Sequence, residues 1–269
     1  MSSNTEYNAT FADFYDSIAA YLSRADVQFY ADEAREAART ATPGITPVLE
    51  LGCGSGRVLI PTAEAGVRIV GLDLSEAMLA KCNERIRALP FEVQERIRVA
   101  RGSMTDFQLG QKFHLITAPF RPFQHLLTVD EQLACLRCVR EHLAPRGRFV
   151  FDMFHTNPAA MHDPAWREER EDTPLTKLPD GRSFRRTARI AAFHRATQTN
   201  DVELNFYITN PDGRTEKQTQ LFPFRYFFRY EMEHLLARAD FRIVNLHGNF
   251  DRSPFADESL EMIFVTEAA

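Results

Sequence analysis

Three glycines and two acids form the most informative pattern in the chain. Gly52, Gly54 and Gly56 follow a short apolar run that contains Glu50, and Asp73 ends the next apolar run. Glycine has no Cβ, so the backbone can turn sharply there and approach a ligand closely. A carboxylate at the position of Asp73 can accept hydrogen bonds from the hydroxyls of a ribose. The combination predicts a site for a nucleoside.

The residues beside the glycines indicate which nucleoside. The fingerprint of dinucleotide-binding proteins requires a small residue where this chain has Arg57. Glu50 precedes the turn, and its carboxylate would repel a pyrophosphate but attract a ligand with ammonium and sulfonium charges. The pattern therefore favours S-adenosylmethionine over a nicotinamide dinucleotide.

Alternating apolar runs and amphipathic segments must position these residues. We predict strands over 48–51, 68–73, 96–100, 113–118 and 148–152 and helices over 57–66, 75–90 and 127–143. Strands that alternate with helices form a parallel, doubly wound α/β sheet. A last helix over 230–239 and strands over 242–246 and 261–265 would complete this core.

The chain divides into four predicted segments. Residues 1–47 form a helical N-terminal cap, 48–154 the core that binds the nucleoside, 155–228 an antiparallel β insertion, and 229–269 the rest of the core. Within the insertion, alternating runs predict strands over 184–195, 202–209 and 214–227. We expect the insertion to act as a lid over the carboxyl edge of the sheet.

Composition excludes several classes of protein. The 269 residues carry a net charge of −5 without a polybasic block, which argues against a nucleic-acid partner. The sequence shows neither a membrane-spanning stretch nor a signal peptide, and its four cysteines read as reduced thiols, so we expect a cytoplasmic protein. Cys135 and Cys138 offer two ligands of the four that structural zinc requires, and no metal site is predicted.

Several segments resemble motifs of the class I S-adenosylmethionine-dependent methyltransferases. Residues 48–57 and 71–75 resemble the first two motifs, 101–107 resembles the motif that contacts adenine, and 113–120 resembles the fourth. The resemblance implies a Rossmann-like sheet of seven strands, mostly parallel, with the last strand antiparallel. The β-rich insertion resembles that of small-molecule N-methyltransferases that act on amino sugars, glycine or related amines.

The resemblance also implies roles around the cofactor. Glu50, Gly52 and Gly54 would line its methionine part, and Asp73 would hold the ribose. Leu74, Ser103 and Met104 would bracket the adenine, although an Asp often stands where this chain has Ser103. Ala118 would lie near the amino-acid end. Tyr15 would close over the sulfonium through its ring face, or would serve only in packing. The residues placed at the cofactor are thus Tyr15, Glu50, Gly52, Gly54, Asp73, Leu74, Ser103, Met104 and Ala118.

The acceptor site is less readable. Residues 118–123 lack the Asn/Asp-Pro-Pro-aromatic motif of nucleic-acid and protein amide methylases, which favours a small-molecule acceptor. His125 and His155 are candidate bases, with buried, hydrogen-bonded structural histidines as the alternative. Candidates for binding the acceptor are Arg121, Arg225, Tyr226 and Arg229. The alternative for Arg121 is a structural role. The alternative for Arg225, Tyr226 and Arg229 is that they form an ordinary junction between a strand and a helix.

The sequence thus predicts methyl transfer to a small-molecule acceptor, with an amine nitrogen favoured over a hydroxyl oxygen. A macromolecular acceptor, a dehydrogenase, and a non-catalytic nucleoside-binding protein that kept the fold are the alternatives. The acidic net charge opposes a macromolecular acceptor, and Arg57 opposes a dehydrogenase. The intact glycines, Glu50 and Asp73 oppose a non-catalytic protein. The oligomeric state stays open, with a homodimer as one option.

Overall fold

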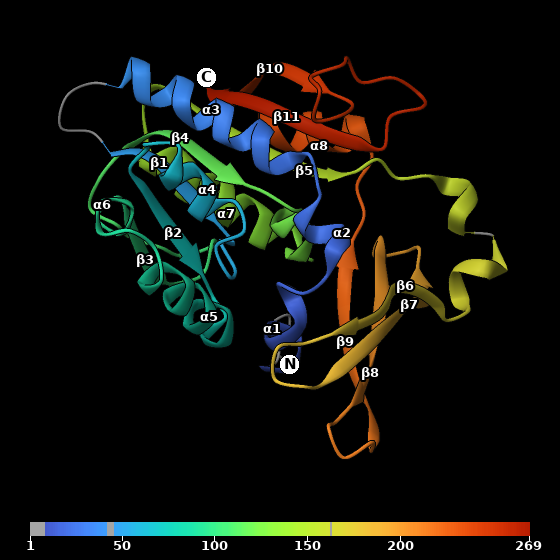
Figure 1. Ribbon diagram of the computed structural model, residues 1–269. Helices are drawn as coiled ribbons and strands as arrows, with labels where there is room; N and C mark the ends of the chain where they lie inside the picture. Colours follow the sequence, from blue (N-terminus) through green and yellow to red (C-terminus); the bar gives the residue numbers. More distant parts are fainter. Residues whose placement is uncertain (1–8, 42–45, 162) are drawn as a thin grey trace. The chain divides into compact units, whose positions relative to one another are not determined.

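The computed structural model describes residues 9–41, 46–161 and 163–269 (Figure 1). The chain separates into two compact units. One unit comprises Met1–Arg24 and Thr156–Tyr226, and the other comprises Ala25–His155 and Phe227–Ala269. We call them the lid unit and the core unit. Residues 1–47, which the sequence analysis treats as one cap, are therefore divided between the two units after Arg24.

The described part of the core unit contains one sheet of seven strands in the order β10-β11-β5-β4-β1-β2-β3. Its strands are β1 (Thr46–Leu51), β2 (Ile69–Asp73), β3 (Ile97–Arg101), β4 (Phe113–Ala118), β5 (Leu143–Phe154), β10 (Phe241–His247) and β11 (Glu261–Ala268). The first five pair in parallel, whereas β11 runs antiparallel to both β5 and β10. The predicted mostly parallel sheet with an antiparallel last strand is confirmed. Its parallel strands end at one edge, where ligands of open α/β sheets bind.

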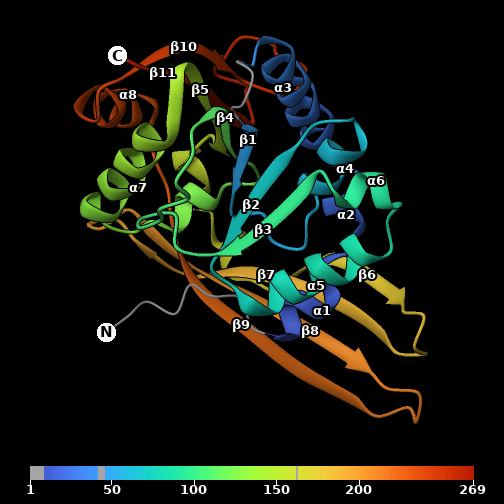
Figure 2. The ribbon, with the colours of Figure 1, turned by 90° about the vertical axis from the view of Figure 1, so that its left-hand side faces the viewer.

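Helices cover both faces of this sheet (Figure 2). One face carries α3 (Asp26–Thr40), α4 (Leu59–Glu64), α5 (Glu76–Arg87) and α6 (Phe91–Gln94), and the other carries α7 (Val129–His142) and α8 (Arg229–Arg238). Local signals set their starts: the Ser75 hydroxyl accepts a hydrogen bond from the Met78 amide at 3.3 Å, and Thr128 forms a capping box with Glu131. Apolar residues of these helices pack on the two faces of the sheet.

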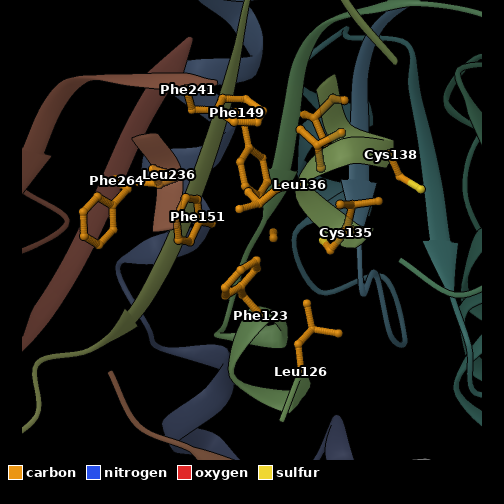
Figure 3. Packing of buried hydrophobic residues seen from close by; sticks show 14 of the residues in the cluster. Phe123, Leu126, Cys135, Leu136, Cys138, Phe149, Phe151, Leu236, Phe241 and Phe264 are labelled. Atoms are coloured by element: carbon orange, nitrogen blue, oxygen red, sulfur yellow. The ribbon is translucent and has the colours of Figure 1, made fainter. Parts of the chain in front are cut away.

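Alternation along the strands supplies the apolar surface under the helices. On β5, Phe149 and Phe151 face α7 and α8, whereas Val150 faces the opposite layer. Figure 3 shows Phe149 and Phe151 packed with Leu136 of α7 and Leu236 of α8. Because these strands are covered on both sides, their sequences read as nearly continuous apolar runs.

The lid unit contains an antiparallel sheet of four strands in its described part, in the order β6-β7-β8-β9. The strands are β6 (Arg170–Lys177), β7 (Ser183–His194), β8 (Thr199–Thr209) and β9 (Thr215–Arg225). The prediction of three strands was wrong in omitting β6. That strand carries Pro174 and many exposed charges, a composition that an edge strand tolerates because only one side of it pairs.

Two short N-terminal helices belong to the lid unit, α1 (Ala9–Tyr15) and α2 (Ala19–Leu22). The Phe14 ring lies 4.7 Å from that of Phe184 and 5.6 Å from that of Phe206, so α1 covers the apolar face of the lid sheet. No helix in the described ranges is both long and apolar enough to cross a membrane.

Candidate functional site

The glycine turn at the end of β1 adopts a backbone that other residues avoid. Gly52 and Gly54 have φ values of +68° and +54°, in the left-handed region. A Cβ on Gly52 would lie 2.8 Å from Cβ of Pro122, closer than two carbon atoms can pack. The Gly52 and Cys53 amides donate to the Leu72 carbonyl at 2.7 and 3.1 Å, which fixes the turn against the end of β2.

Glu50 lies beside this turn with 2% of its surface exposed. Burial raises the pKa of its carboxyl well above the ordinary value, although the positive charge of Arg57 acts in the opposite direction. Among the described residues, no group donates a hydrogen bond to Oε2 of Glu50. A buried acceptor of this kind is costly unless a ligand supplies the donor. The position therefore suits a cationic nitrogen, as the sequence analysis expects.

Arg57 is held in a buried ion pair that the sequence did not reveal. Its guanidinium donates two hydrogen bonds to the carboxylate of Asp26, at 2.8 and 2.6 Å, and the two side chains are 6% and 0% exposed. The same guanidinium lies 4.7 Å from the centre of the Phe120 ring. Arg57 thus links the start of α3 with the turn that follows β4.

Asp73 ends β2 and organises the turns around it. Its Oδ2 accepts from the Gly54 amide at 2.7 Å and its Oδ1 accepts from the Ser75 amide at 2.8 Å. A carboxylate accepts hydrogen bonds through both of its oxygens and can accept more than one bond on each. The half-buried carboxylate can therefore shape the glycine turn and also bind ribose hydroxyls.

The loop after β3 supplies the predicted adenine side. The Gly102 amide donates to the Asp73 carbonyl at 3.0 Å, which holds this loop next to β2. Ser103 Oγ lies 2.7 Å from Thr105 Oγ1, Met104 is half-buried against the core, and Leu74 is 46% exposed. An exposed Leu74 beside a fixed loop is compatible with a flat aromatic ligand, and its contact with adenine stays a prediction.

The structure brings most predicted cofactor residues to one edge of the core sheet. At or just beyond the carboxyl ends of β1, β2, β3 and β4 lie Glu50, Gly52, Gly54, Asp73, Leu74, Ser103, Met104 and Ala118. Tyr15 belongs to the lid unit, where its ring contacts those of Phe11 and Tyr21 at 5.4 and 5.0 Å. Its role at the sulfonium remains a prediction.

The turn after β4 is strained. Phe120 and Arg121 have φ values of +65° and +69°, which costs a residue with a Cβ about 1–2 kcal/mol. Arg121 is 6% exposed, pairs with Glu261 at 2.5 Å and lies 3.4 Å from the centre of the Phe154 ring. Its guanidinium is thus engaged inside the core unit, which favours the structural alternative over the predicted binding of an acceptor anion.

The two candidate histidines differ in their surroundings. His125 ends the short 3-10 helix η1 (Pro122–His125), and burial lowers its pKa to about 4. His155 follows β5, and its Nδ1 lies 2.8 Å from the Ser259 carbonyl oxygen. Since a carbonyl only accepts, Nδ1 carries a proton, and Nε2 is the ring nitrogen that remains to exchange a proton with an acceptor. The role of either histidine as a base stays a prediction.

The predicted basic and aromatic cluster is split between the units. Arg225 and Tyr226 belong to the lid unit, where the Arg225 guanidinium donates to the Thr197 carbonyl at 2.7 Å. Arg229 begins α8 in the core unit and pairs with Glu233 at 2.7 Å. These contacts give each residue a local structural role, and binding of the acceptor by Arg225, Tyr226 and Arg229 stays a prediction.

Two further functional candidates escaped the sequence analysis. Asp152 on β5 and Tyr30 on α3 are 0% and 1% exposed, and the Tyr30 hydroxyl donates to Asp152 Oδ1 at 2.7 Å. A carboxylate inside an otherwise apolar strand was the available signal. Cys135 and Cys138, by contrast, are core residues and are not disulfide-bonded (Figure 3).

The chain is similar to known methyltransferases. Residues 48–147 match the model of a methyltransferase domain. The chain is 27% identical over 246 residues to the dTDP-3-amino-3,4,6-trideoxy-alpha-D-glucopyranose N,N-dimethyltransferase of Streptomyces venezuelae, covering 90% of this chain and 94% of the relative. It is 29% identical over 194 residues to the dTDP-4-amino-2,3,4,6-tetradeoxy-D-glucose N,N-dimethyltransferase of Saccharopolyspora spinosa, covering 68% and 72%. The solved structure of the CcbJ methyltransferase from Streptomyces caelestis is similar with a TM-score of 0.71 and 27% identity, over 98% of this chain and 100% of that one.

Proposed function

Because the chain belongs to the S-adenosylmethionine-dependent methyltransferases, we propose that it methylates the amine nitrogen of a small molecule and that its acceptors are amino sugars. The methyl-donor part of this proposal rests on Oε2 of Glu50, which lies next to the glycine turn and has no hydrogen-bond partner among the described residues. The relatives that methylate amino sugars support the acceptor half, and the similarity to the Streptomyces venezuelae enzyme extends over 90% of the chain.

The residues at the sheet edge fit S-adenosylmethionine. Glu50 would receive its ammonium group, the glycine turn would admit its methionine part, and Asp73 would hold the ribose hydroxyls. When bound, the cofactor supplies a methyl group that its sulfonium already activates. The protein must then align the acceptor, exclude water and accept a proton.

The proton requirements favour an amine over a hydroxyl. An amine reacts through its neutral form and needs only a weak base, whereas a sugar hydroxyl needs a base to deprotonate it during transfer. His125 is a poor proton acceptor because its pKa is lowered to about 4. His155 offers Nε2 as a proton acceptor, since the Ser259 carbonyl fixes a proton on Nδ1. We assign to His155 the removal of a proton from the acceptor ammonium.

A transfer assay tests the acceptor class. The protein is incubated with methyl-labelled S-adenosylmethionine and matched pairs of nucleotide sugars that differ only in an amino or a hydroxyl group at one carbon. We expect label in the amino sugars alone, as one or two added methyl groups by mass spectrometry. Label in a hydroxyl sugar without label in its amino counterpart would contradict the proposal.

The two histidines provide a matched comparison for the base. His155→Gln should restrict turnover to pH values at which the acceptor amine is already neutral, so the rate should fall most at low pH. His125→Gln should change this pH profile little. Equal profiles for the wild type and His155→Gln would exclude His155 as the base.

A further inference from the structure

The turn between β4 and η1 holds two consecutive left-handed residues that are not glycine. Phe120 and Arg121 have φ values of +65° and +69°. Residues with a Cβ stay in this region only where the surrounding structure holds them there, and such strain concentrates at functional sites. The contacts around the turn therefore indicate what maintains it.

One buried carboxylate holds the first of these residues. Asp152 Oδ1 accepts from the Phe120 amide at 2.8 Å and from the Tyr30 hydroxyl at 2.7 Å. Asp152 is 0% exposed and Tyr30 is 1% exposed, so water does not compete for these bonds. A single oxygen thus joins α3, β5 and the turn after β4.

The same turn borders the glycine turn of the cofactor site. The Arg57 guanidinium lies 4.7 Å from the centre of the Phe120 ring. Pro122, two residues further, occupies the space that a Cβ on Gly52 would need, at 2.8 Å. A displacement of the turn after β4 would therefore move the wall of the site beside the methyl donor.

We propose that Asp152, supported by Tyr30, is a positioning residue that holds Phe120 and Arg121 in the left-handed turn and thereby aligns the acceptor with the methyl donor. Asp152 acts through the turn and does not touch the reacting atoms. The role in alignment rests on the methyl transfer proposed above. The contacts of Asp152 with the turn do not depend on it.

Three variants distinguish the effect of the accepting oxygen of Asp152 from the effect of its charge. Asp152→Asn retains an oxygen that can accept from both donors, Asp152→Ala removes it, and Tyr30→Phe removes one donor. Tyr207→Phe is the matched control, because the Tyr207 hydroxyl donates to Glu169 at 2.9 Å on the exposed surface of the lid unit. For each protein, amide hydrogen exchange over 118–126, the Kd of S-adenosylmethionine and steady-state turnover are measured.

We expect Asp152→Ala to lose protection of the Phe120 amide and to lower kcat roughly 10- to 100-fold, because small misplacements of reacting groups are costly. The Kd of the cofactor should change by less than about threefold, since Asp152 bonds Phe120 and Tyr30, and neither is among the residues placed at the cofactor. Asp152→Asn should restore both protection and turnover, Tyr30→Phe should fall between them, and Tyr207→Phe should match the wild type.

Several results would overturn the proposal. These are a protected Phe120 amide in Asp152→Ala, a failure of Asp152→Asn to restore turnover, or a loss of cofactor affinity as large as the loss of turnover. If Asp152→Ala does not fold, Asp152→Asn and Tyr30→Phe still decide between these outcomes. A wild type that transfers label to no amine would contradict the acceptor class instead. Turnover of the wild type and of the variants would then be measured with the acceptor that does become labelled. The hydrogen-exchange test of the turn needs no acceptor and would remain valid.

Discussion

Replacing Glu50 by glutamine should stabilise the protein and weaken binding of its cofactor. The substitution keeps the shape of the side chain and removes its charge. Because burial disfavours the anionic form of Glu50, holding its charge at neutral pH should cost about 1–3 kcal/mol more than holding a neutral amide at the same position. We expect the free energy of unfolding without ligand to rise by that amount at neutral pH.

The pH dependence of this gain has a defined sign. Burial raises the pKa of Glu50 in the folded protein above the ordinary value of 4.5, so the folded state holds a proton that the unfolded state has released. The stability of the wild type therefore falls as the pH rises from about 4.5 toward the raised pKa. Glutamine does not titrate, so the advantage of Glu50→Gln should vanish at low pH and grow through this window.

Cofactor affinity should change in the opposite direction. The ammonium group of S-adenosylmethionine would lose a charge-assisted hydrogen bond worth about 1.5–3 kcal/mol, which raises Kd roughly 10- to 150-fold. Urea unfolding between pH 4 and 8 measures stability, and titration calorimetry measures Kd. Glu203→Gln is the control, because hydrogen bonds from Arg189 lower the pKa of Glu203 and its loss should not stabilise. A Glu50→Gln variant that is less stable than the wild type at pH 7, with unchanged cofactor affinity, would refute this reasoning.

Three other substitutions test the site and its support. Asp73→Ala should raise the Kd of S-adenosylmethionine at least roughly tenfold by calorimetry, since it removes the acceptor for ribose hydroxyls. Gly52→Ala should abolish binding of the cofactor in the same assay, because its φ is +68° and the new Cβ would lie 2.8 Å from Pro122. Asp26→Ala should lower the free energy of unfolding, measured in urea, by about 3–5 kcal/mol, because it leaves the buried Arg57 without its carboxylate partner. A second substitution in the same protein, Arg57→Met, should recover part of this loss. Wild-type stability of Asp26→Ala alone would show that the ion pair is dispensable.

Local patterns were sufficient to predict the sheet and to place Gly52 and Asp73 at its carboxyl edge. The apolar runs before Gly52 and up to Asp73 end where parallel strands end, and both residues therefore lie at the carboxyl edge. The same reasoning failed for β6, because an edge strand with Pro174 and exposed charges lacks the alternation that indicates a strand.

The contacts that fix the site are not local. Arg57 pairs with a carboxylate 31 residues away, and Tyr30 with one 122 residues away. Composition and periodicity identify neither partner, because pairing depends on how α3 packs on the sheet. A charge in the apolar run of β5 marks Asp152 as unusual, but only the fold shows what that charge holds.

The lid unit is assembled from two distant parts of the chain, and this limits how the unit can be exchanged between relatives. Phe14 of α1 packs on Phe184 and Phe206 of the lid sheet. A chimera that takes only residues 156–226 from a relative would place a foreign sheet under the resident helix and leave mismatched rings between them. Grafts should therefore carry residues 1–24 together with 156–226, which creates three junctions with the core unit, after residues 24, 155 and 226.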